Sequence, residues 1–261
     1  MIATKKLNNF KVKPLELPSE ITRPLKGHEL FPINYPNIFI CSKKFSGKTT
    51  TIFNILKKTA SKRTEIIIFS STINNDPSWK QIVEYFEKKG INVITYQGIV
   101  EGKTNHLQEL TDHLAQDKEE EEDKFHSILF PEDNEEEEEK KEKKPGPEYI
   151  LVFDDLSNQL QNKSIEQLLK RNRHLRIMNI ISSQYYNDLS KQSRTNLDFI
   201  LLFKNLPEDK LELIHKESDL AIDFERFKRL YKYATEGNYN FLWSNLRNET
   251  FRKNFNLEIS I

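Results

Sequence analysis

Short apolar runs alternate with amphipathic stretches along most of the chain. The apolar runs are rich in Ile, Val, Leu and Phe, which is typical of strands that are buried on both faces. Their alternation with helix-like stretches predicts an α/β fold with a mostly parallel central sheet flanked by helices. The predicted strands are 37–41, 65–70, 92–96, 149–153, 177–182, 197–203 and a last one at 239–243.

The amphipathic stretches between these strands predict helices that cover both faces of the sheet. In the stretch 78–89, for example, Ile82, Val83 and Phe86 recur on one helical face, and Gly90 follows as a C-cap residue. The predicted helices are 49–58, 78–89, 105–115, 164–171, 207–215 and 222–233.

Two segments interrupt this pattern. Residues 1–35 contain four prolines and no clear periodicity, and we predict that they form an extended arm. Residues 36–261 then form one domain, interrupted at 117–147 by a strongly acidic insert. Such a charged stretch has too little apolar surface to fold alone, which favours a solvated, disordered loop. An ordered element that binds a protein or mimics DNA is the alternative.

The acidic insert conceals the charge of the remaining chain. Residues 117–144 contain fourteen acidic residues and six lysines, whereas the whole chain has 40 residues of each sign. The remainder therefore carries an excess of eight positive charges. A basic body is compatible with a polyanionic partner, although charge alone does not identify one.

Cysteine usage and the N-terminus indicate a cellular compartment. Cys41 is the single cysteine, so no disulfide can form within the chain, which suits a reducing compartment. The N-terminus lacks the apolar core of a signal peptide, and no apolar run approaches the roughly 20 residues that span a bilayer. We therefore expect a soluble, intracellular protein without a membrane anchor.

The segment Ser42-Lys-Lys-Phe-Ser-Gly-Lys-Thr49 lies between a predicted strand and a predicted helix. It matches the phosphate-binding pattern G-x-x-x-x-G-K-[ST], except that Ser42 replaces the first glycine. In such a loop the backbone N–H groups surround a phosphate, Lys48 reaches the β- and γ-phosphates of ATP, and the Thr49 hydroxyl binds Mg²⁺. A lysine-rich surface turn is the alternative. The residues expected to bind the nucleotide are Ser42, Lys43, Lys44, Phe45, Ser46, Gly47, Lys48, Thr49 and Thr50.

A second motif, Tyr149-Ile-Leu-Val-Phe-Asp-Asp155, is an apolar strand that ends in two carboxylates. This is the Walker B arrangement, and we expect its strand to lie beside the phosphate-loop strand and to deliver the carboxylates to the metal. Asp154 would hold Mg²⁺, and Asp155 would orient or activate the attacking water. An acidic N-cap of the next helix is the alternative, which the co-occurrence with the phosphate loop disfavours.

Gln184 follows the predicted strand 177–182. Ligands of open α/β sheets bind at the carboxyl ends of the strands, so Gln184 is placed to sense the γ-phosphate or to position water. An ordinary glutamine at the end of a strand is an equally good interpretation of this residue alone.

Three further segments resemble one family. They are Arg171-Asn-Arg-His174, the strand end Ile-Ile-Ser-Ser-Gln184, and the segment 194–204, in which Arg-Thr-Asn precedes an apolar strand and Phe-Lys. With the two motifs above, they resemble the genome-packaging ATPases of large eukaryotic DNA viruses, virophages and related elements, which belong to the FtsK/HerA branch of P-loop ATPases. The resemblance covers about residues 36–204, without the acidic insert.

The resemblance implies a P-loop NTPase fold of the RecA/FtsK type and a Mg²⁺-dependent ATPase that moves double-stranded DNA into a capsid. It also implies a homo-oligomeric ring, a hexamer or pentamer, with capsid proteins as partners, at the virus assembly site in the host cell or in the virion. Asp154 takes the Mg²⁺ position, Asp155 the catalytic acid position, where FtsK-like proteins usually carry Glu, and Gln184 the sensor position. Candidates for an arginine that acts on the nucleotide of a neighbouring subunit are Arg171, Arg173 and Arg194, although each of them could be a plain surface cation.

Other classes of function are open on the sequence. A GTPase would carry an N-K-x-D motif, which the chain lacks, and no arginine cluster typical of the lid of a small-molecule kinase is evident. A nucleotide switch without motor activity is one alternative. A degenerate scaffold is another, motivated by Ser42 and by the Asp-Asp ending of the Walker B strand.

Overall fold

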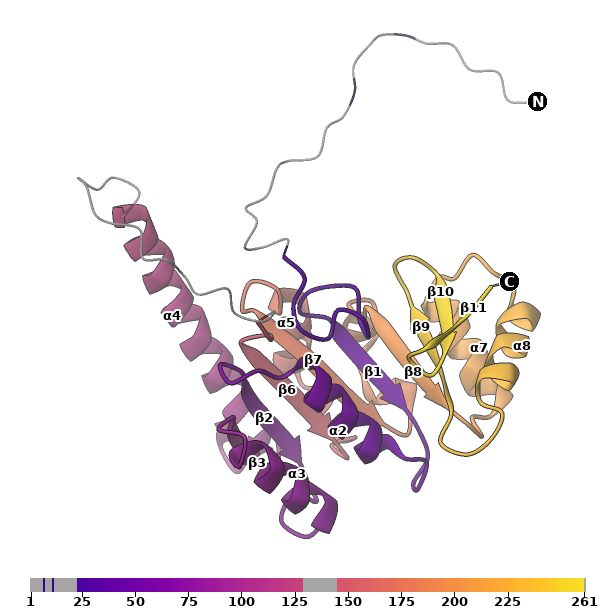
Figure 1. Cartoon of the computed structure of the whole chain (residues 1–261), viewed down its shortest axis with the longest axis horizontal. Helices are drawn as coiled ribbons and strands as arrows, with labels where there is room; N and C mark the ends of the chain where they lie inside the picture. Colours follow the sequence, from indigo (N-terminus) through magenta and orange to yellow (C-terminus); the bar gives the residue numbers. More distant parts are fainter. Residues whose placement is uncertain (1–6, 8–10, 12–22, 129–144, 261) are drawn as a thin grey trace.

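The fold is built on one large twisted sheet with helices on both faces (Figure 1). The computed structural model describes residues 7, 11, 23–128 and 145–260, and for 118–128 it describes the backbone alone. The nine-stranded sheet has the order β11-β10-β9-β8-β1-β7-β6-β2-β3. The six strands from β8 to β3 are parallel to one another, whereas β9, β10 and β11 are antiparallel additions. The predicted α/β class with a mostly parallel sheet is confirmed.

Most of the strands lie where the apolar runs predict them. The strands of the large sheet are β1 (Asn37–Cys41), β2 (Glu65–Ser70), β3 (Asn92–Tyr96), β6 (Tyr149–Asp154), β7 (Ile177–Ser183), β8 (Phe199–Phe203), β9 (Phe241–Asn245), β10 (Thr250–Lys253) and β11 (Leu257–Ile259). A two-stranded sheet consists of β4 (Val100–Glu101) and β5 (Thr104–Asn105). The prediction that β9 is the last strand is wrong, because β10 and β11 are short, mixed in polarity and paired only at the sheet edge.

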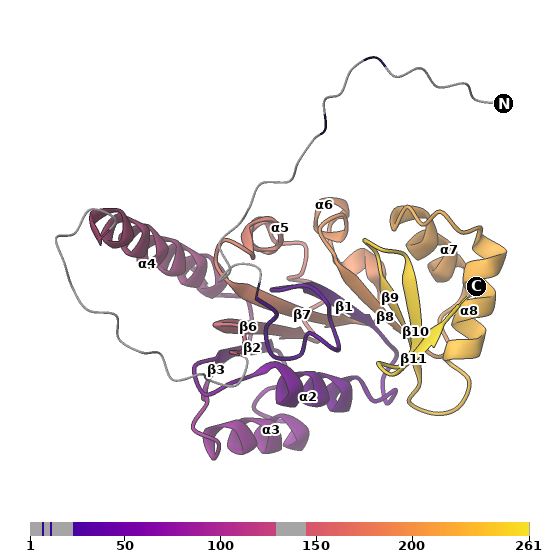
Figure 2. The ribbon, with the colours of Figure 1, turned by 45° about the horizontal axis from the view of Figure 1, so that its top comes forward.

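The helices form a layer on each face of the sheet (Figure 2). One face is covered by α2 (Lys48–Thr59) and α3 (Pro77–Glu87), and the other by α4 (His106–Ile128), α5 (Lys163–Arg171), α7 (Glu208–Glu217) and α8 (Phe224–Ala234). A 3-10 turn, η1 (Tyr186–Asp188), and the short helix α6 (Lys191–Arg194) connect β7 to β8. Within the described ranges, no helix is long and apolar enough to span a bilayer.

Alternate residues of the central strands pack into separate cores on the two faces. In β1, Phe39 and Cys41 belong to the core beneath α4, α5, α7 and α8, whereas Ile38 and Ile40 belong to the core beneath α2 and α3. All five residues of β1 are buried. This two-sided burial explains why the strand reads as a continuous apolar run.

The N-terminal segment 23–35 completes the second core. It forms turns, and Phe31 places its ring centroid 5.0 Å from that of Phe199 in β8 and 5.8 Å from that of Phe255. Part of the predicted arm is therefore packed against the sheet rather than extended. Residues 1–22, apart from Leu7 and Lys11, lie outside the described residues.

The acidic insert begins inside a helix. The helix predicted to end at residue 115 continues as α4 to Ile128, so the first part of the predicted insert is helical. Residues 129–144, on which the rest of that prediction falls, lie outside the described residues. The chain then returns to the body, where the Pro147 carbonyl accepts a hydrogen bond of 2.7 Å from Thr64 Oγ1 and the Pro145 carbonyl one of 2.8 Å from Lys26 N–H.

The role of the N-terminal segment in the core can be tested by Phe31→Ala. The side chain is 2% exposed, so we expect the substitution to lower the free energy of unfolding by about 3–5 kcal/mol. Urea denaturation followed by circular dichroism measures this loss. The matched control is Phe45→Ala, the same substitution at a 98% exposed position, which should change stability by no more than about 0.5 kcal/mol. Equal stability of the two variants would show that the segment does not complete the core.

Candidate functional site

The three strands that precede the predicted site residues end at one edge of the sheet. The register pairs Cys41 of β1 with Ser183 of β7, and Ser182 of β7 with Asp154 of β6. The expectation that the Walker B strand lies beside the phosphate-loop strand is wrong, because β7 lies between β1 and β6. Adjacent strands are roughly 4.8 Å apart, so the gap across one inserted strand is close to the reach of a lysine side chain.

The phosphate loop joins β1 to the N-terminus of α2. Gly47 is the N-cap residue, with φ 94°, and no side chain caps the helix, so the first N–H groups of α2 point to the loop without a side-chain partner. Phe45 also has a positive φ, 62°, and its side chain is 98% exposed. Such turns aim successive N–H groups into a concavity, and the helix dipole adds positive potential there. The loop therefore has the backbone geometry of an anion site.

Ser42 replaces a glycine without needing the conformational freedom of a glycine. It is not among the described residues with a positive φ, and its N–H donates a hydrogen bond of 3.1 Å to the Ser183 carbonyl. The Ser42 side chain is fully buried. The departure from the pattern therefore does not strain the backbone, and it gives no support to a degenerate loop.

An ion pair joins the two predicted motifs. Lys48 Nζ lies 3.1 Å from Asp154 Oδ1 and also donates a hydrogen bond to Asp155 Oδ1. The Lys48 side chain is 11% exposed and that of Asp154 is 2% exposed. Burial alone would lower the pKa of Lys48, but the two carboxylates outweigh burial and raise this pKa above its ordinary value. The site therefore keeps Lys48 charged.

Asp154 lies in a row of buried oxygen atoms. Ser42, Asp154 and Ser182 lie at the ends of three neighbouring strands, and their side-chain oxygen atoms are buried. Ser42 Oγ has no hydrogen-bond partner within the described part of the chain, whereas Asp154 Oδ1 is contacted by Lys48 Nζ. Burial raises the pKa of the Asp154 carboxyl above its usual range, against the opposing charge of Lys48. A buried carboxylate with spare acceptor capacity is suited to a hard divalent cation.

These oxygen atoms suit Mg²⁺ better than a metal ion whose ligands are all protein side chains. Among the described residues, no group of three or more His, Cys, Asp or Glu side chains could hold a metal ion. Mg²⁺ is usually held by one or two carboxylates together with substrate phosphates and water, so it does not require such a group. Thr49, half-buried in the first turn of α2, and Asp154 are the predicted ligands.

The backbone at Asp155 explains how two consecutive carboxylates reach one lysine. Successive residues of a strand point to opposite faces, so Asp154 and Asp155 would diverge in a regular strand. Asp155 instead has φ 53°, directly after the end of β6, and its side chain is one-third exposed.

The backbone carbonyl of Asp155 accepts a hydrogen bond of 2.8 Å from Ser71 Oγ. Ser71 was missed by the sequence reasoning, although it directly follows β2, a strand that ends at the same edge.

Gln184 lies at the carboxyl end of the strand that separates the two motifs. It is half-buried directly after β7, the strand that separates β1 from β6, and its carbonyl lies 3.7 Å from Cys41 Sγ. The structure thus brings Lys48, Asp154 and Asp155 into contact and sets Gln184 at the same edge.

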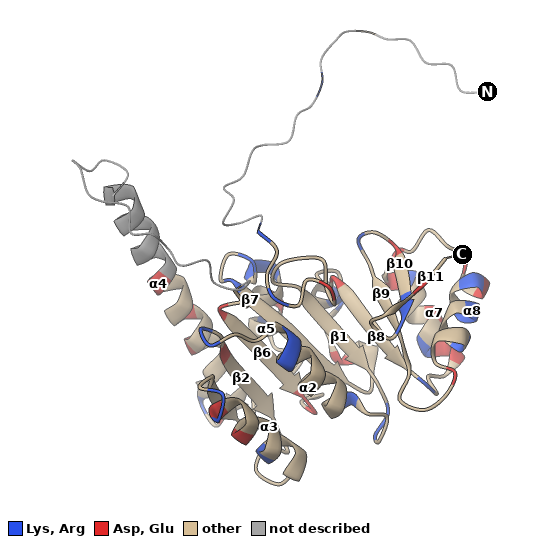
Figure 3. Cartoon of the chain, in the orientation of Figure 1, with Lys and Arg blue, Asp and Glu red and all other residues tan. Residues whose placement is uncertain are grey.

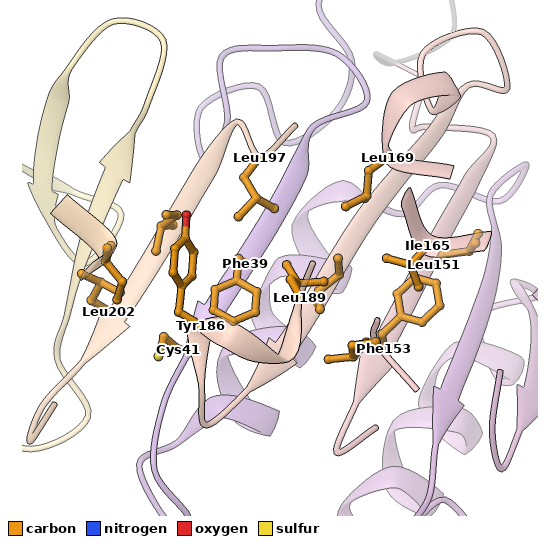
Figure 4. Close-up of a cluster of buried hydrophobic side chains, with 14 of the residues drawn as sticks. Phe39, Cys41, Leu151, Phe153, Ile165, Leu169, Tyr186, Leu189, Leu197 and Leu202 are labelled. Atoms are coloured by element: carbon orange, nitrogen blue, oxygen red, sulfur yellow. The ribbon is translucent and has the colours of Figure 1, made fainter. Parts of the chain in front are cut away.

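The core beneath this edge is tightly packed (Figure 4). Tyr186, directly below the turn after β7, places its ring centroid 5.6 Å from that of Phe39, and Cys41 lies beside them. Burial raises the pKa of Cys41 and that of Tyr186 to about 12 each, so both stay neutral. The strand ends that carry the site therefore rest on buried side chains of Cys41 and Tyr186 that carry no charge.

The three candidate arginines are not part of this site within one chain. Arg173 lies beyond the end of α5, where its guanidinium is 3.0 Å from Asp198, at the amino edge of the sheet. Arg194 forms an ion pair of 2.6 Å with Glu217 and packs over the ring of Tyr186. Both arginines line a cavity of 440 Å³ at that amino edge.

Arg171 differs from the other two candidates. It ends α5, and its exposed side chain makes no hydrogen bond or ion pair with the residues that the structure describes. It lies near the amino edge of the sheet, opposite the phosphate loop. Arg171 can therefore meet a nucleotide only if that nucleotide is bound by another copy of the chain.

Solved structures with a similar fold come from archaeal viruses. The crystal structure of B204, the DNA-packaging ATPase from Sulfolobus turreted icosahedral virus, superposes with a TM-score of 0.53 and 18% identity, over 87% of this chain and 98% of B204. The genome packaging NTPase B204 from Sulfolobus turreted icosahedral virus 2 in complex with AMP gives a TM-score of 0.52, with the same identity and coverage. These likenesses show that the fold is that of a P-loop ATPase.

Sequence comparison identifies the family. A relative in Invertebrate iridescent virus 6, the uncharacterized protein 075L, is 29% identical over 101 residues, which are 37% of this chain and 39% of that protein. The model of the family described as Poxvirus A32 protein matches residues 30–232. This match covers most of the chain and confirms the resemblance to packaging ATPases that the sequence motifs indicate. The chain belongs to the poxvirus A32 protein family.

Proposed function

We propose that this protein is an ATP-driven translocase that packages double-stranded viral DNA into a capsid. The observation that carries the proposal is the contact of Lys48 with Asp154 and Asp155 at the N-terminus of α2. Membership in the poxvirus A32 family supports it, as do the fold relatives named as packaging ATPases of viruses. Its place of action would be the site of virus assembly in the host cell or the virion.

ATP binding would use the free N–H groups between Gly47 and Thr49. They and the α2 dipole hold the β-phosphate, and Lys48 exchanges its two carboxylate partners for the β- and γ-phosphates. Thr49 and Asp154 are the residues that would hold Mg²⁺, which neutralises phosphate charge when bound. The raised pKa of Lys48 ensures that the lysine is charged when it meets the phosphates.

Hydrolysis would depend on the Asp155 carboxylate, which Lys48 no longer contacts once it binds the phosphates. When Lys48 turns to the phosphates, the Asp155 carboxylate is free to orient a water molecule and to accept its proton. Gln184, on the adjacent strand end, would hold the same water in line with the γ-phosphate. The φ of 53° at Asp155 keeps its carboxylate on the nucleotide side.

A second copy of the chain is needed to complete this site. Of the three candidate arginines, Arg171 alone is exposed and unpaired among the described residues, whereas Arg173 and Arg194 are held in ion pairs. We therefore assign Arg171 the role of stabilising charge on the γ-phosphate of a neighbouring subunit. The proposed assembly is a homo-oligomeric ring, a hexamer or pentamer, that docks on capsid proteins and has DNA in its pore.

The described surface does not reveal a DNA path by charge alone. Figure 3 shows Lys and Arg interspersed with Asp and Glu on α7 and α8. Outside the segment 117–144, however, the chain has an excess of eight positive charges, which favours attraction to the DNA phosphates over a distance.

Two substitutions separate binding from chemistry. Lys48→Ala removes the phosphate contact and should abolish ATP binding, whereas Asp155→Asn should keep ATP binding and lower kcat by about 10²–10⁴-fold. Equilibrium binding of labelled ATP and a steady-state phosphate-release assay measure the two effects. Asp112→Asn, at an exposed position on α4, is the control and should match the wild type. Equal turnover of Asp155→Asn and the wild type would remove Asp155 from the catalytic role.

The assignment of Arg171 is tested by mixing two inactive variants. Arg171→Ala keeps its phosphate loop, and Lys48→Ala keeps its arginine, so each should be inactive alone, with the loss for Arg171→Ala about 10³-fold. A mixed ring should regain ATPase activity, because it places Arg171 of one variant at the intact loop of the other. Lys170→Ala, one residue away, is the control and should not need complementation. No recovery in the mixture would exclude Arg171 as the shared residue.

Motor function predicts coupling between DNA and ATP. If the protein moves along the phosphate backbone, duplex DNA should increase its ATPase rate, and rising salt should remove the stimulation as counterions compete. The measurement is phosphate release with and without duplex DNA at several salt concentrations. An ATPase rate that is the same with and without DNA would contradict the translocase and leave a nucleotide switch.

A further inference from the structure

Tyr239 lies directly against the phosphate loop although it is far from it in the sequence. A Cβ atom built on Gly47 would be 3.0 Å from Cδ1 of Tyr239 and 3.7 Å from its Cγ, so the phenol ring covers the backbone of this glycine. β9 is antiparallel to β8 and pairs Phe241 with Phe203, so the loop that leads into β9 arrives at the carboxyl edge of the parallel strands. Tyr239 belongs to that loop.

The ring is exposed and yet held in place. Tyr239 is 70% exposed, and its φ of 63° is a strained backbone conformation for a bulky residue. Hydrogen bonds on either side fix the loop: Asn240 Nδ2 donates to the Glu236 carbonyl at 2.5 Å, and Asn254 Nδ2 donates to Asn240 Oδ1 at 2.9 Å. An exposed aromatic ring held on a strained backbone contributes little to the core, which points to a ligand.

The direction of a bound nucleotide follows from the order of the strands. The residues that would face the γ-phosphate, Asp154, Asp155 and Gln184, follow β6 and β7, on one side of β1. A triphosphate bound across Gly47 and Lys48 therefore has its nucleoside on the other side of β1, where β8 and β9 lie. Tyr239 lies on that side and packs directly against Gly47 of the phosphate loop.

We propose that Tyr239 is a nucleoside-binding residue, whose ring stacks on the base of the nucleotide held by the phosphate loop. This inference rests on the proposed nucleotide binding and adds the site of the base. Stacking on an aromatic ring tolerates any base, because every base presents a π-face. Tyr239 therefore strengthens binding of ATP and of GTP by the same factor and does not select between them.

Another exposed aromatic residue at the same edge is less suited to this role. Tyr185 directly follows Gln184 and so lies after β7, on the side of the carboxylates. Its ring is already covered by Lys210, whose Nζ is 3.7 Å from the ring centroid. The geometry therefore assigns the base to Tyr239.

The test compares ligands with and without a base. Isothermal titration of the full-length protein in the presence of Mg²⁺ uses ATP, GTP and inorganic tripolyphosphate, which has the phosphates alone. Tyr239→Ala should weaken binding of both nucleotides about tenfold and leave tripolyphosphate unchanged, whereas Tyr239→Phe should keep the affinity of the wild type. Tyr233→Ala, at a 55% exposed tyrosine on α8, is the matched control and should bind all three ligands normally.

The possible results separate this inference from the function on which it rests. If Tyr239→Ala binds ATP as tightly as the wild type does, the proposed base site is wrong. It is also wrong if the variant loses affinity for tripolyphosphate by the same factor as for ATP. In both cases the proposed phosphate site is not contradicted. If the wild-type protein binds neither ATP nor tripolyphosphate, the proposed nucleotide binding fails and the base site with it.

A fluorescence readout gives an independent check. The two native tryptophans, Trp79 and Trp243, are fully buried. A Tyr239→Trp substitution therefore adds an indole at an exposed position, next to the phosphate loop. ATP should quench its emission by stacking, and tripolyphosphate should not. Equal changes with both ligands would show that the residue senses the phosphates and not a base.

Discussion

The site depends on the burial of a parallel sheet on both faces. Because β1, β7 and β6 run in one direction and are covered on each side, their carboxyl ends open together at a single edge. The amide groups at the start of α2, the carboxylates at the end of β6 and Gln184 after β7 are brought together by this register, and the contact of Lys48 with Asp154 and Asp155 then joins two of these segments. A shift of one residue in β6 would turn Asp154 to the opposite face of the sheet.

Lys48 can neutralise either the two carboxylates or a bound phosphate, and the charge balance at this edge of the sheet differs between the two arrangements. With the lysine on Asp154 and Asp155, the charges of the two carboxylates are compensated. Moving the lysine to a phosphate would leave a nearly buried carboxylate without its partner, which is costly unless another cation replaces it. Binding of a nucleotide together with Mg²⁺ satisfies both requirements, so the electrostatics of the proposed site favour the metal complex over the nucleotide alone.

The sequence predicts the parts of the fold that local patterns determine. β1 and β2 lie at the predicted residues because a strand buried on both faces is a continuous apolar run. The order of the strands is not local, so the sequence could not show that β7 separates the two motifs. Nor could it show that Phe31 closes a core, since its contacts with Phe199 and Phe255 join distant parts of the chain. Lys48, Asp154 and Asp155 were found from their motifs, whereas Ser71 and Tyr239 carry no motif and reach the site by sheet pairing alone.

The placement of the arginines constrains how copies of the chain can associate. The phosphate loop lies at the carboxyl edge of the sheet and Arg171 near the amino edge, so one chain cannot bring them together. A symmetric pair that joins two carboxyl edges would also leave Arg171 outside both sites. A head-to-tail contact, in which the amino edge of one copy faces the carboxyl edge of the next, supplies an arginine to each loop. Such heterologous contacts form a closed ring when the rotation between copies closes, and an open filament when it does not. If Arg171 has the role proposed for it, a closed ring both completes every site and limits the number of subunits.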